Sequence, residues 1–317
     1  MKKYEMLPTE ENIIETLYND PINRNKDIVY FYNILQAQES ASAIAIDGRW
    51  GSGKTFFVRQ TKMVINALNP SSTIDEETKA KATVRLLFSK NDEENENYSI
   101  AVYYDAWEND NDTEPVLSLI YEITKQLSVD FSLSDISVVK TAGAIIEAIS
   151  GHNINGIKDA LTSEDPFKKF KEEKDVEQKI KDFFASILVE RGNRLIIFID
   201  ELDRCKPTFA VHLLEQIKHY IFDDRITFVF SINLEQLQHT IKQYYGADFD
   251  SCRYLDRFFD LRISMPPANM EKFYSEIGLE SRYYVDIVTK RIINMYNFEL
   301  REITRFYSQI RSEERRV

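Results

Sequence analysis

The stretch Gly48-Arg49-Trp50-Gly51-Ser52-Gly53-Lys54-Thr55 decides the fold of this chain, because it matches the pattern G-x4-G-K-[ST] at every defined position. It follows the apolar run 40–48, which predicts a buried strand, and precedes residues 54–69, whose apolar spacing predicts an amphipathic helix. Glycines let such a loop wrap so that its backbone N–H groups face a phosphate chain. The segment therefore predicts a phosphate-binding loop between a strand and a helix.

The distribution of glycine supports this interpretation. The chain of 317 residues has only nine glycines, and three of them lie between positions 48 and 53. The alternative is that these glycines serve only a tight turn. In a phosphate loop, Lys54 is expected to neutralise the β- and γ-phosphate oxygens, and Thr55 to ligate Mg²⁺. The residues expected to bind the nucleotide are Gly48, Trp50, Gly51, Ser52, Gly53, Lys54, Thr55 and Phe56.

A second apolar run, 194–200, ends in two carboxylates. A parallel strand of this composition is buried, and its side chains emerge at the carboxyl end, where ligands of α/β sheets bind. Asp200 is expected to contact Mg²⁺ through water, and Glu201 to polarise the attacking water. Acidic pairs at strand ends are common, so this interpretation depends on the phosphate loop.

Strand and helix patterns alternate along the rest of the chain. Helices are predicted in the first 38 residues, over most of 115–190, and after Pro266 to the end, with the long helix of the middle region beginning at Pro166. This alternation predicts βαβ units and a parallel sheet with helices on both faces. Further strands are predicted at 84–89, 99–107, 225–233 and 258–264.

The string Asp200-Glu201-Leu202-Asp203-Arg204-Cys205-Lys206-Pro207 resembles the acidic Walker B element of the KAP family of P-loop NTPases. The GRWGSGKT loop and the segment Tyr104-Asp105-Ala106-Trp107 are similar to further motifs of that family. The resemblance extends from about residue 20 to residue 308. It implies an α/β fold of the additional-strand catalytic-glutamate type, with sheet order 5-1-4-3-2 and the 41–47 strand central. The sensor strand then lies between that strand and the Walker B strand.

This resemblance also suggests how the chain is divided. Residues 1–266 would form the P-loop core, with a helical insertion at about 115–190, and residues 267–317 a C-terminal helical lobe. Many family members carry transmembrane helices between the two Walker elements. Here the stretch 128–165 is too short and too interrupted for that, so a membrane span is not expected.

Several other residues are candidates for the site. Asn233 follows a predicted strand and is expected either to orient water or γ-phosphate or to cap a helix. A P-loop ATPase needs an arginine for the transferred phosphoryl group, and Arg257 and Arg301 are preferred over Arg253 and Arg305.

Four residues of the family motifs have two interpretations each. Trp107 is interpreted as a buried anchor in preference to a contact with base or ribose. Trp50 is expected to act through its backbone and packing more than through its indole. Asp203 and Arg204 are expected to form an internal network, the alternative being a link to a neighbouring subunit.

Composition limits the function further. The net charge is −12, which argues against a nucleic-acid coat without excluding a local basic groove. Cys205 and Cys252 have no metal-ligand spacing, and the first residues lack the apolar stretch of a signal peptide. These features predict a soluble cytoplasmic protein.

The leading hypothesis is a Mg²⁺-dependent NTPase, with ATP favoured because no GTPase-type base-reading NKxD motif is present. It would couple hydrolysis to assembly or conformational change, as a homo-oligomer or with a separately encoded partner. Family resemblance suggests phage or plasmid exclusion, and hence an antiviral defence. The alternatives are a nucleotide-dependent binding switch or scaffold with little intrinsic hydrolysis, and a nucleic-acid-stimulated motor.

Overall fold

The structure is a computed structural model that describes residues 6–84, 98–131, 168–188, 192–220, 223–280 and 283–314, together with Ala142 and Ile145. Within these residues the chain builds one five-stranded sheet, in which all neighbouring strands are parallel. Its order is β2-β3-β4-β1-β5, which confirms the predicted 5-1-4-3-2; β1 is an interior strand, and β4 occupies the middle. The strands are β1 (Ser42–Asp47), β2 (Ser99–Asp105), β3 (Arg194–Asp200), β4 (Ile226–Ile232) and β5 (Leu261–Ser264).

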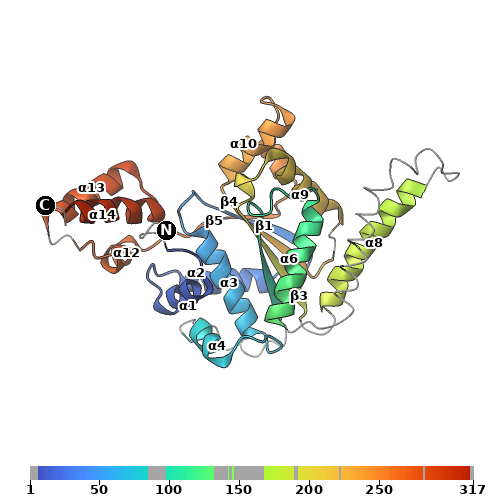
Figure 1. Cartoon of the computed structure of the whole chain (residues 1–317), viewed down its shortest axis with the longest axis horizontal. Coiled ribbons are helices and arrows are strands. Elements are labelled where there is room, and N and C mark those ends of the chain that lie inside the picture. Colours follow the sequence, from blue (N-terminus) through green and yellow to red (C-terminus); the bar gives the residue numbers. More distant parts are fainter. Residues whose placement is uncertain are drawn as a thin grey trace.

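The middle residues of the interior strands are mostly apolar because helices cover both faces of the sheet (Figure 1). One face packs against α1 (Glu10–Asn19), α2 (Asn25–Gln36), α3 (Lys54–Leu68) and α4 (Glu76–Thr83). Side chains of alternate strand residues enter this layer, among them Ile44, Ile196 and Val229, all fully buried. They meet apolar residues of the helices such as Phe31 and Phe57, whose rings lie 5.7 Å apart.

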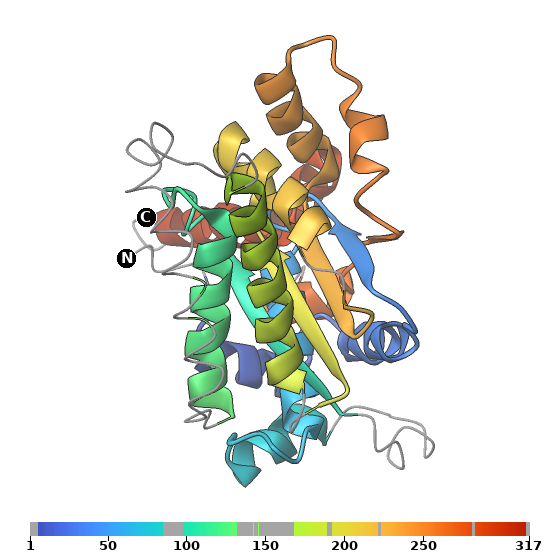
Figure 2. The ribbon, with the colours of Figure 1, turned by 90° about the vertical axis from the view of Figure 1, so that its right-hand side faces the viewer.

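The other face carries a second helical layer, which lies in front of the strands in Figure 2. Its helices are α6 (Pro115–Asp130), α8 (Lys168–Leu188), α9 (Pro207–Tyr220), α10 (Leu234–Tyr245) and α11 (Ser251–Leu255). The intervening strand residues, for example Ile197 and Phe230, point into this layer. Helix α8 is the outermost of these helices, on the side of the molecule away from the C-terminal end (Figure 1).

The helices after β5 form a separate lobe beside the sheet (Figure 1). They are α12 (Met270–Glu276), α13 (Tyr284–Tyr296) and α14 (Leu300–Glu314). The lobe has an apolar core of its own, built from Tyr274, Leu279, Ile293, Ile303 and Tyr307. A small lobe with its own core can keep its internal packing while it shifts against the sheet.

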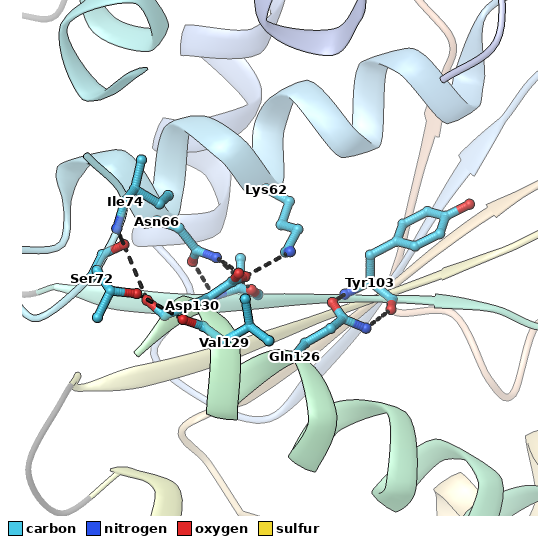
Figure 3. Close-up of polar contacts among 10 residues, drawn as sticks. Lys62, Asn66, Ser72, Ile74, Tyr103, Gln126, Val129 and Asp130 are labelled. Atoms are coloured by element: carbon cyan, nitrogen blue, oxygen red, sulfur yellow. Dashed lines mark hydrogen bonds and ion pairs between the residues drawn. The ribbon is translucent and has the colours of Figure 1, made fainter. Parts of the chain in front are cut away.

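Among the described residues, the outer edge of β2 has no neighbouring strand, and side-chain amides bind its backbone there (Figure 3). Asn66 of α3 donates to the carbonyl of Ala101 over 2.9 Å and accepts the Ala101 N–H over 2.8 Å. Gln126 of α6 makes the same pair of hydrogen bonds with Tyr103. The amides thus stand in for a sixth strand and satisfy backbone groups that would otherwise recruit a partner chain.

The sequence prediction and the structure differ, or cannot be compared, at one predicted strand and two helices. The strand predicted at 84–89 is wrong at its first residue, since Val84 is the C-cap of α4, and residues 85–89 lie outside the described residues. The start predicted at Pro166 for the long helix also lies outside them, although the helix itself is present from Lys168. Helix α4 was not predicted. None of the helices described here combines the length and apolar character needed to cross a membrane.

Candidate functional site

The loop between β1 and α3 has the backbone that its glycines make possible. Gly51 has φ 88° and Gly53 has φ 91°, both in the left-handed region that other residues adopt only with strain. At Gly48 the restriction is space, because a Cβ there would lie 2.8 Å from the Cβ of Met265. Each glycine of the motif therefore has its own physical reason, and the loop wraps back over the start of α3.

Lys54, the first residue of α3, turns its side chain back into this loop. Its ammonium group donates to the carbonyl of Gly48 over 2.6 Å and to that of Arg49 over 3.2 Å. The side chain is almost wholly buried, and burial lowers the pKa of Lys54, although Asp203 and Asp200 oppose that shift. The lysine that should meet phosphate oxygens is thus held by carbonyl oxygens of its own loop.

Two carboxylates lie side by side at the carboxyl ends of β3 and β2. Asp200 and Asp105 are paired in the sheet register. Asp200 is 1% exposed and accepts a hydrogen bond of 3.0 Å from the hydroxyl of Tyr103. Burial, and after it the charge of Asp200, raises the pKa of Asp105. This pair concentrates negative charge where the family pattern predicts a magnesium ligand.

Glu201 lies immediately after β3, in a turn that costs backbone strain. Its φ is 61°, an unusual conformation for a glutamate. Burial raises the pKa of its carboxyl to about 7, the neighbouring Asp200 adds to the shift, and Arg204 opposes it. Arg204 Nε forms an ion pair with the Glu201 carboxylate. The carboxylate proposed to polarise water is therefore occupied by an arginine three residues later.

The three family motifs converge around Arg204. Its guanidinium carbon lies 5.7 Å from the ring centre of Trp50 and 5.3 Å from that of Trp107. The indole of Trp50 also donates a hydrogen bond of 2.6 Å to Asp203, whose pKa is raised by burial. The prediction of an internal network for Asp203 and Arg204 fits these contacts.

The two tryptophans differ from what the sequence suggested. Trp107 is 52% exposed, so the prediction of a buried anchor is wrong. It follows the end of β2, and its side chain packs on Arg204 outside the sheet. Trp50 acts through its indole, by the hydrogen bond to Asp203, and not only through backbone and packing.

A cavity of about 460 Å³ opens in front of the loop. Its walls come from the phosphate loop and α3, from the strand ends, from the turn between α1 and α2, and from the C-terminal lobe. The loop and strand ends contribute Gly51, Gly53, Lys54, Thr55, Phe56, Asp105, Trp107, Glu201 and Arg204. The apolar end of the cavity contains Pro21, Ile22, Phe273, Ile277 and Leu300.

Two arginines from distant parts of the sequence border this cavity. The Arg24 guanidinium donates to the carbonyl of Ser52 over 2.8 Å and to that of Pro266 over 2.7 Å, and burial lowers its pKa to about 10. Arg301, at the start of α14, also lines the cavity, and its backbone N–H donates to the carbonyl of Gly51 over 3.3 Å. The C-terminal lobe therefore touches the phosphate loop directly.

Other candidates lie elsewhere. The side chain of Asn233 caps α10 by accepting the N–H of Gln236 over 3.3 Å, which is the capping alternative of the prediction. Arg257 is exposed and does not line the cavity, and Arg253 forms an exposed ion pair with Asp250. Of the two preferred arginines, only Arg301 borders the cavity of its own chain; Arg305 is not among the lining residues.

The sequence reasoning missed Arg24 and Asp105 as site residues. Asp105 stands at the carboxyl end of a predicted strand, and the same rule that singled out Asp200 would have found it. Arg24 gave no such signal, because its partner Pro266 is 242 residues away in the sequence.

The residues at the cavity fit a magnesium nucleotide. The hydroxyl of Ser52 is buried and, within the described part of the chain, has no hydrogen-bond partner, so a phosphate oxygen would satisfy it. Thr55 supplies a second hydroxyl in the cavity wall. The Asp200 carboxylate is buried next in sequence to Glu201, which lines the cavity, and is a hard oxygen ligand suited to Mg²⁺.

Comparison with known proteins agrees with this geometry. The family model described as "KAP family P-loop domain" matches residues 24–315, which is most of the chain. No curated protein matches.

Proposed function

The chain belongs to the KAP family of P-loop domains, and on that premise we propose that it is a Mg²⁺-dependent ATPase that couples the nucleotide cycle to movement of its C-terminal lobe. The coarser part, a nucleotide-binding P-loop domain, follows from the family. Hydrolysis, the choice of ATP and the coupling are the proposal.

The observation that carries the proposal is the shared wall of the cavity. Phosphate-loop residues such as Lys54 and Thr55, the strand-end Glu201, and the lobe residues Phe273 and Arg301 line one space. A nucleotide with its phosphates on the loop would place its base at the apolar end, beside the lobe. The bound nucleotide would then contact both the sheet and the lobe. It would bind more tightly when the lobe is close to the sheet, and this difference in affinity would shift the lobe.

The chemistry follows from the side chains at the strand ends. On nucleotide binding, the ammonium of Lys54 would exchange two loop carbonyls for β- and γ-phosphate oxygens. Thr55 and Asp200 would hold Mg²⁺, which neutralises charge on the phosphate oxygens when bound. Glu201 would accept a hydrogen bond from a water molecule and orient it in line with the γ-phosphate.

The arginine that neutralises the transferred phosphoryl group has two candidates. Arg301 lines the cavity of its own chain, which supports a role in cis. Arg257 is exposed and does not line the cavity of its own chain, so it would act only on the site of a neighbouring copy in an oligomer. We favour Arg301 for the isolated chain.

Replacement of Glu201 by glutamine tests the proposal. The variant should bind ATP about as tightly as the wild type and should lose about 100-fold or more in the hydrolysis rate, because the amide cannot take up the proton. Calorimetry with ATP and Mg²⁺ measures binding, and single-turnover phosphate release measures hydrolysis. Turnover at the wild-type rate would disprove the role of Glu201, and absence of binding by the wild type would disprove the proposal as a whole.

A nucleotide-dependent switch with little intrinsic hydrolysis is the second candidate, and the ion pair of Glu201 with Arg204 favours it. In this case the isolated chain would bind ATP and release almost no phosphate. Phosphate release measured against protein concentration distinguishes the two. Specific activity that rises with concentration supports a site completed by a second copy, a constant activity supports the ATPase in cis, and none at any concentration supports the switch.

The biological role that we propose, from family resemblance alone, is exclusion of phage or plasmid in a bacterial cytoplasm, with a protein partner. Expression of the wild-type chain with its neighbouring genes should lower phage plating in a bacterial host. The same genes with Lys54→Ala should restore plating, because the exclusion would depend on nucleotide binding.

A further inference from the structure

Arg204, in the wall of the cavity, has three close partners. Its guanidinium packs near the rings of Trp50 and Trp107 and pairs with the carboxylate of Glu201. Only about a fifth of its side chain is exposed, and 15% of that of Glu201. An ion pair in such surroundings is stronger than one at a free surface, because little water screens it.

The same side chain borders the position expected for phosphate. Arg204 lines the cavity together with Lys54, Thr55 and Glu201. Its charge acts on the Lys54 ammonium strongly enough to contribute to the lowered pKa of that lysine. A γ-phosphate bound by Lys54 therefore lies within the electrostatic reach of the guanidinium.

A γ-phosphate competes well for this group. It carries more negative charge than a carboxylate, and it offers the bidentate oxygens that a guanidinium prefers. The rings of Trp50 and Trp107 would continue to attract the guanidinium while it changes partners, because the attraction between a cation and an aromatic ring does not depend on which anion the cation pairs with. A diphosphate would end one phosphate earlier, on the loop, and would present no γ-phosphate oxygens to the guanidinium.

We propose that Arg204 occupies Glu201 until a triphosphate binds, and that the guanidinium then transfers from the Glu201 carboxylate to the γ-phosphate, which frees Glu201 to orient water. This inference rests on the proposed ATPase function and deepens it, since it assigns the triphosphate-sensing step to a residue of the Walker B segment. The glutamate becomes available only when there is a γ-phosphate to attack.

The chain contains its own reporter of this movement. Trp50 and Trp107 are its only two tryptophans, and both rings lie beside Arg204. The wild type should therefore show a change in intrinsic fluorescence with the non-hydrolysable analogue AMP-PNP and Mg²⁺, and little change with ADP and Mg²⁺.

Replacement of Arg204 by alanine provides the test. The variant should still bind both nucleotides, should lose the fluorescence difference between AMP-PNP and ADP, and should have a kcat about 10- to 100-fold lower with KM within about threefold, because the missing group acts after binding. Arg204→Lys should restore part of the difference and part of kcat. The variants Trp50→Phe and Trp107→Phe, which keep Arg204, assign the signal to each ring.

The outcomes separate this inference from the proposed function. An AMP-PNP-specific signal that persists in Arg204→Ala, or equal signals with AMP-PNP and ADP in the wild type, would overturn the role of Arg204 while binding and hydrolysis stand. Failure of the wild type to bind any nucleotide in calorimetry would overturn the proposed function itself. If Arg204→Ala does not fold, as circular dichroism would show, Arg204→Lys and the wild-type comparison of AMP-PNP with ADP decide the question.

Discussion

The outer edge of β2 and the phosphate loop satisfy their polar groups in opposite ways. At the edge, Asn66 and Gln126 present a donor and an acceptor to one residue each, and every hydrogen bond has a complementary partner (Figure 3). At the loop, the Lys54 ammonium lies on carbonyls of its own loop. The amides at the edge offer one donor and one acceptor to each backbone residue that they bind. The positive charge of the Lys54 ammonium faces carbonyl oxygens, which carry only partial negative charge.

The difference teaches which contacts belong to the fold and which belong to a ligand cycle. The complementary amide pairs at β2 stabilise the sheet, and a bound ligand would not be expected to alter their hydrogen bonds. A buried ammonium with a lowered pKa and a glutamate paired with an arginine are costly arrangements that a bound anion would relieve. The two regions should therefore respond oppositely to substitution.

The largest effect is expected from Lys54→Ala. Nucleotide affinity should fall about 100-fold or more, or about 2.7 kcal/mol, because the phosphate charge loses its main cation. The free energy of unfolding should change by no more than about 1 kcal/mol, since the variant also removes a buried charge. Calorimetry with ATP and urea unfolding measure the two quantities.

Lys62→Ala is the matched control on the same helix. Lys62, near the middle of α3, forms an ion pair of 2.8 Å with Asp130 at the end of α6. Loss of this pair should leave nucleotide affinity within about twofold, as expected of a pair outside the site. Equal losses of affinity in both variants would mean that α3 as a whole, and not the loop lysine, determines binding.

Asn66→Ala should show the reverse pattern. It leaves the N–H and C=O of Ala101 without their partners, so the free energy of unfolding should fall by about 2–3 kcal/mol, while nucleotide affinity stays within about twofold of the wild type. Urea unfolding and calorimetry measure these values. Asn294→Ala, at an exposed asparagine of α13, is the control. An unchanged stability of the Asn66 variant would show that water replaces the amide at this edge.

A smaller effect is expected from Arg301→Ala. The side chain borders the cavity from the lobe, so its loss should lower kcat/KM for ATP about 10-fold, equal to about 1.4 kcal/mol of transition-state stabilisation. Steady-state hydrolysis measures it. Arg305→Ala, one turn further along α14 and outside the cavity lining, should stay within about twofold. A larger loss with Arg305 would reverse the assignment.

The smallest effect concerns pH. The pKa of Glu201 is raised to about 7 from an ordinary value of 4.5, so the folded protein holds this proton more tightly than the unfolded chain. The resulting stabilisation is fully present below about pH 4.5 and is lost as pH rises through 7. Without nucleotide and with EDTA present, Glu201→Gln should raise Tm relative to the wild type by about 2–5 °C more at pH 8 than at pH 5. The same difference at both values would contradict the shift.

Much of the fold could be predicted because its signals are local. The runs that became β1, β3 and β4 are mostly apolar, and the loop glycines mark where the first strand gives way to α3. Helix α4 escaped prediction because its eight residues have almost no apolar face and begin from a single aspartate cap, Asp75. A short polar helix looks like a loop when only periodicity is considered.

The site residues that belong to a local motif or to a strand end could be predicted. Contacts between segments that are distant in the sequence could not. Lys54 and Glu201 come from motifs with fixed spacing, and both line the cavity. The contacts of Arg204 with Trp50 and Trp107 join three separate segments, and no spacing within one segment encodes them. The exposure of Trp107 was not predicted for the same reason, because Trp107 packs on the side chain of Arg204 and not on the sheet.

The two hydrogen bonds of Arg24 link two parts of the molecule that are far apart in the sequence. One guanidinium plane donates both to the phosphate loop at Ser52 and to the connection between β5 and α12 at Pro266. A shift of the lobe that moves this connection would either pull on the loop or break one of these hydrogen bonds. A residue near the N-terminus thus links the connection that leads to the last three helices with the phosphate loop.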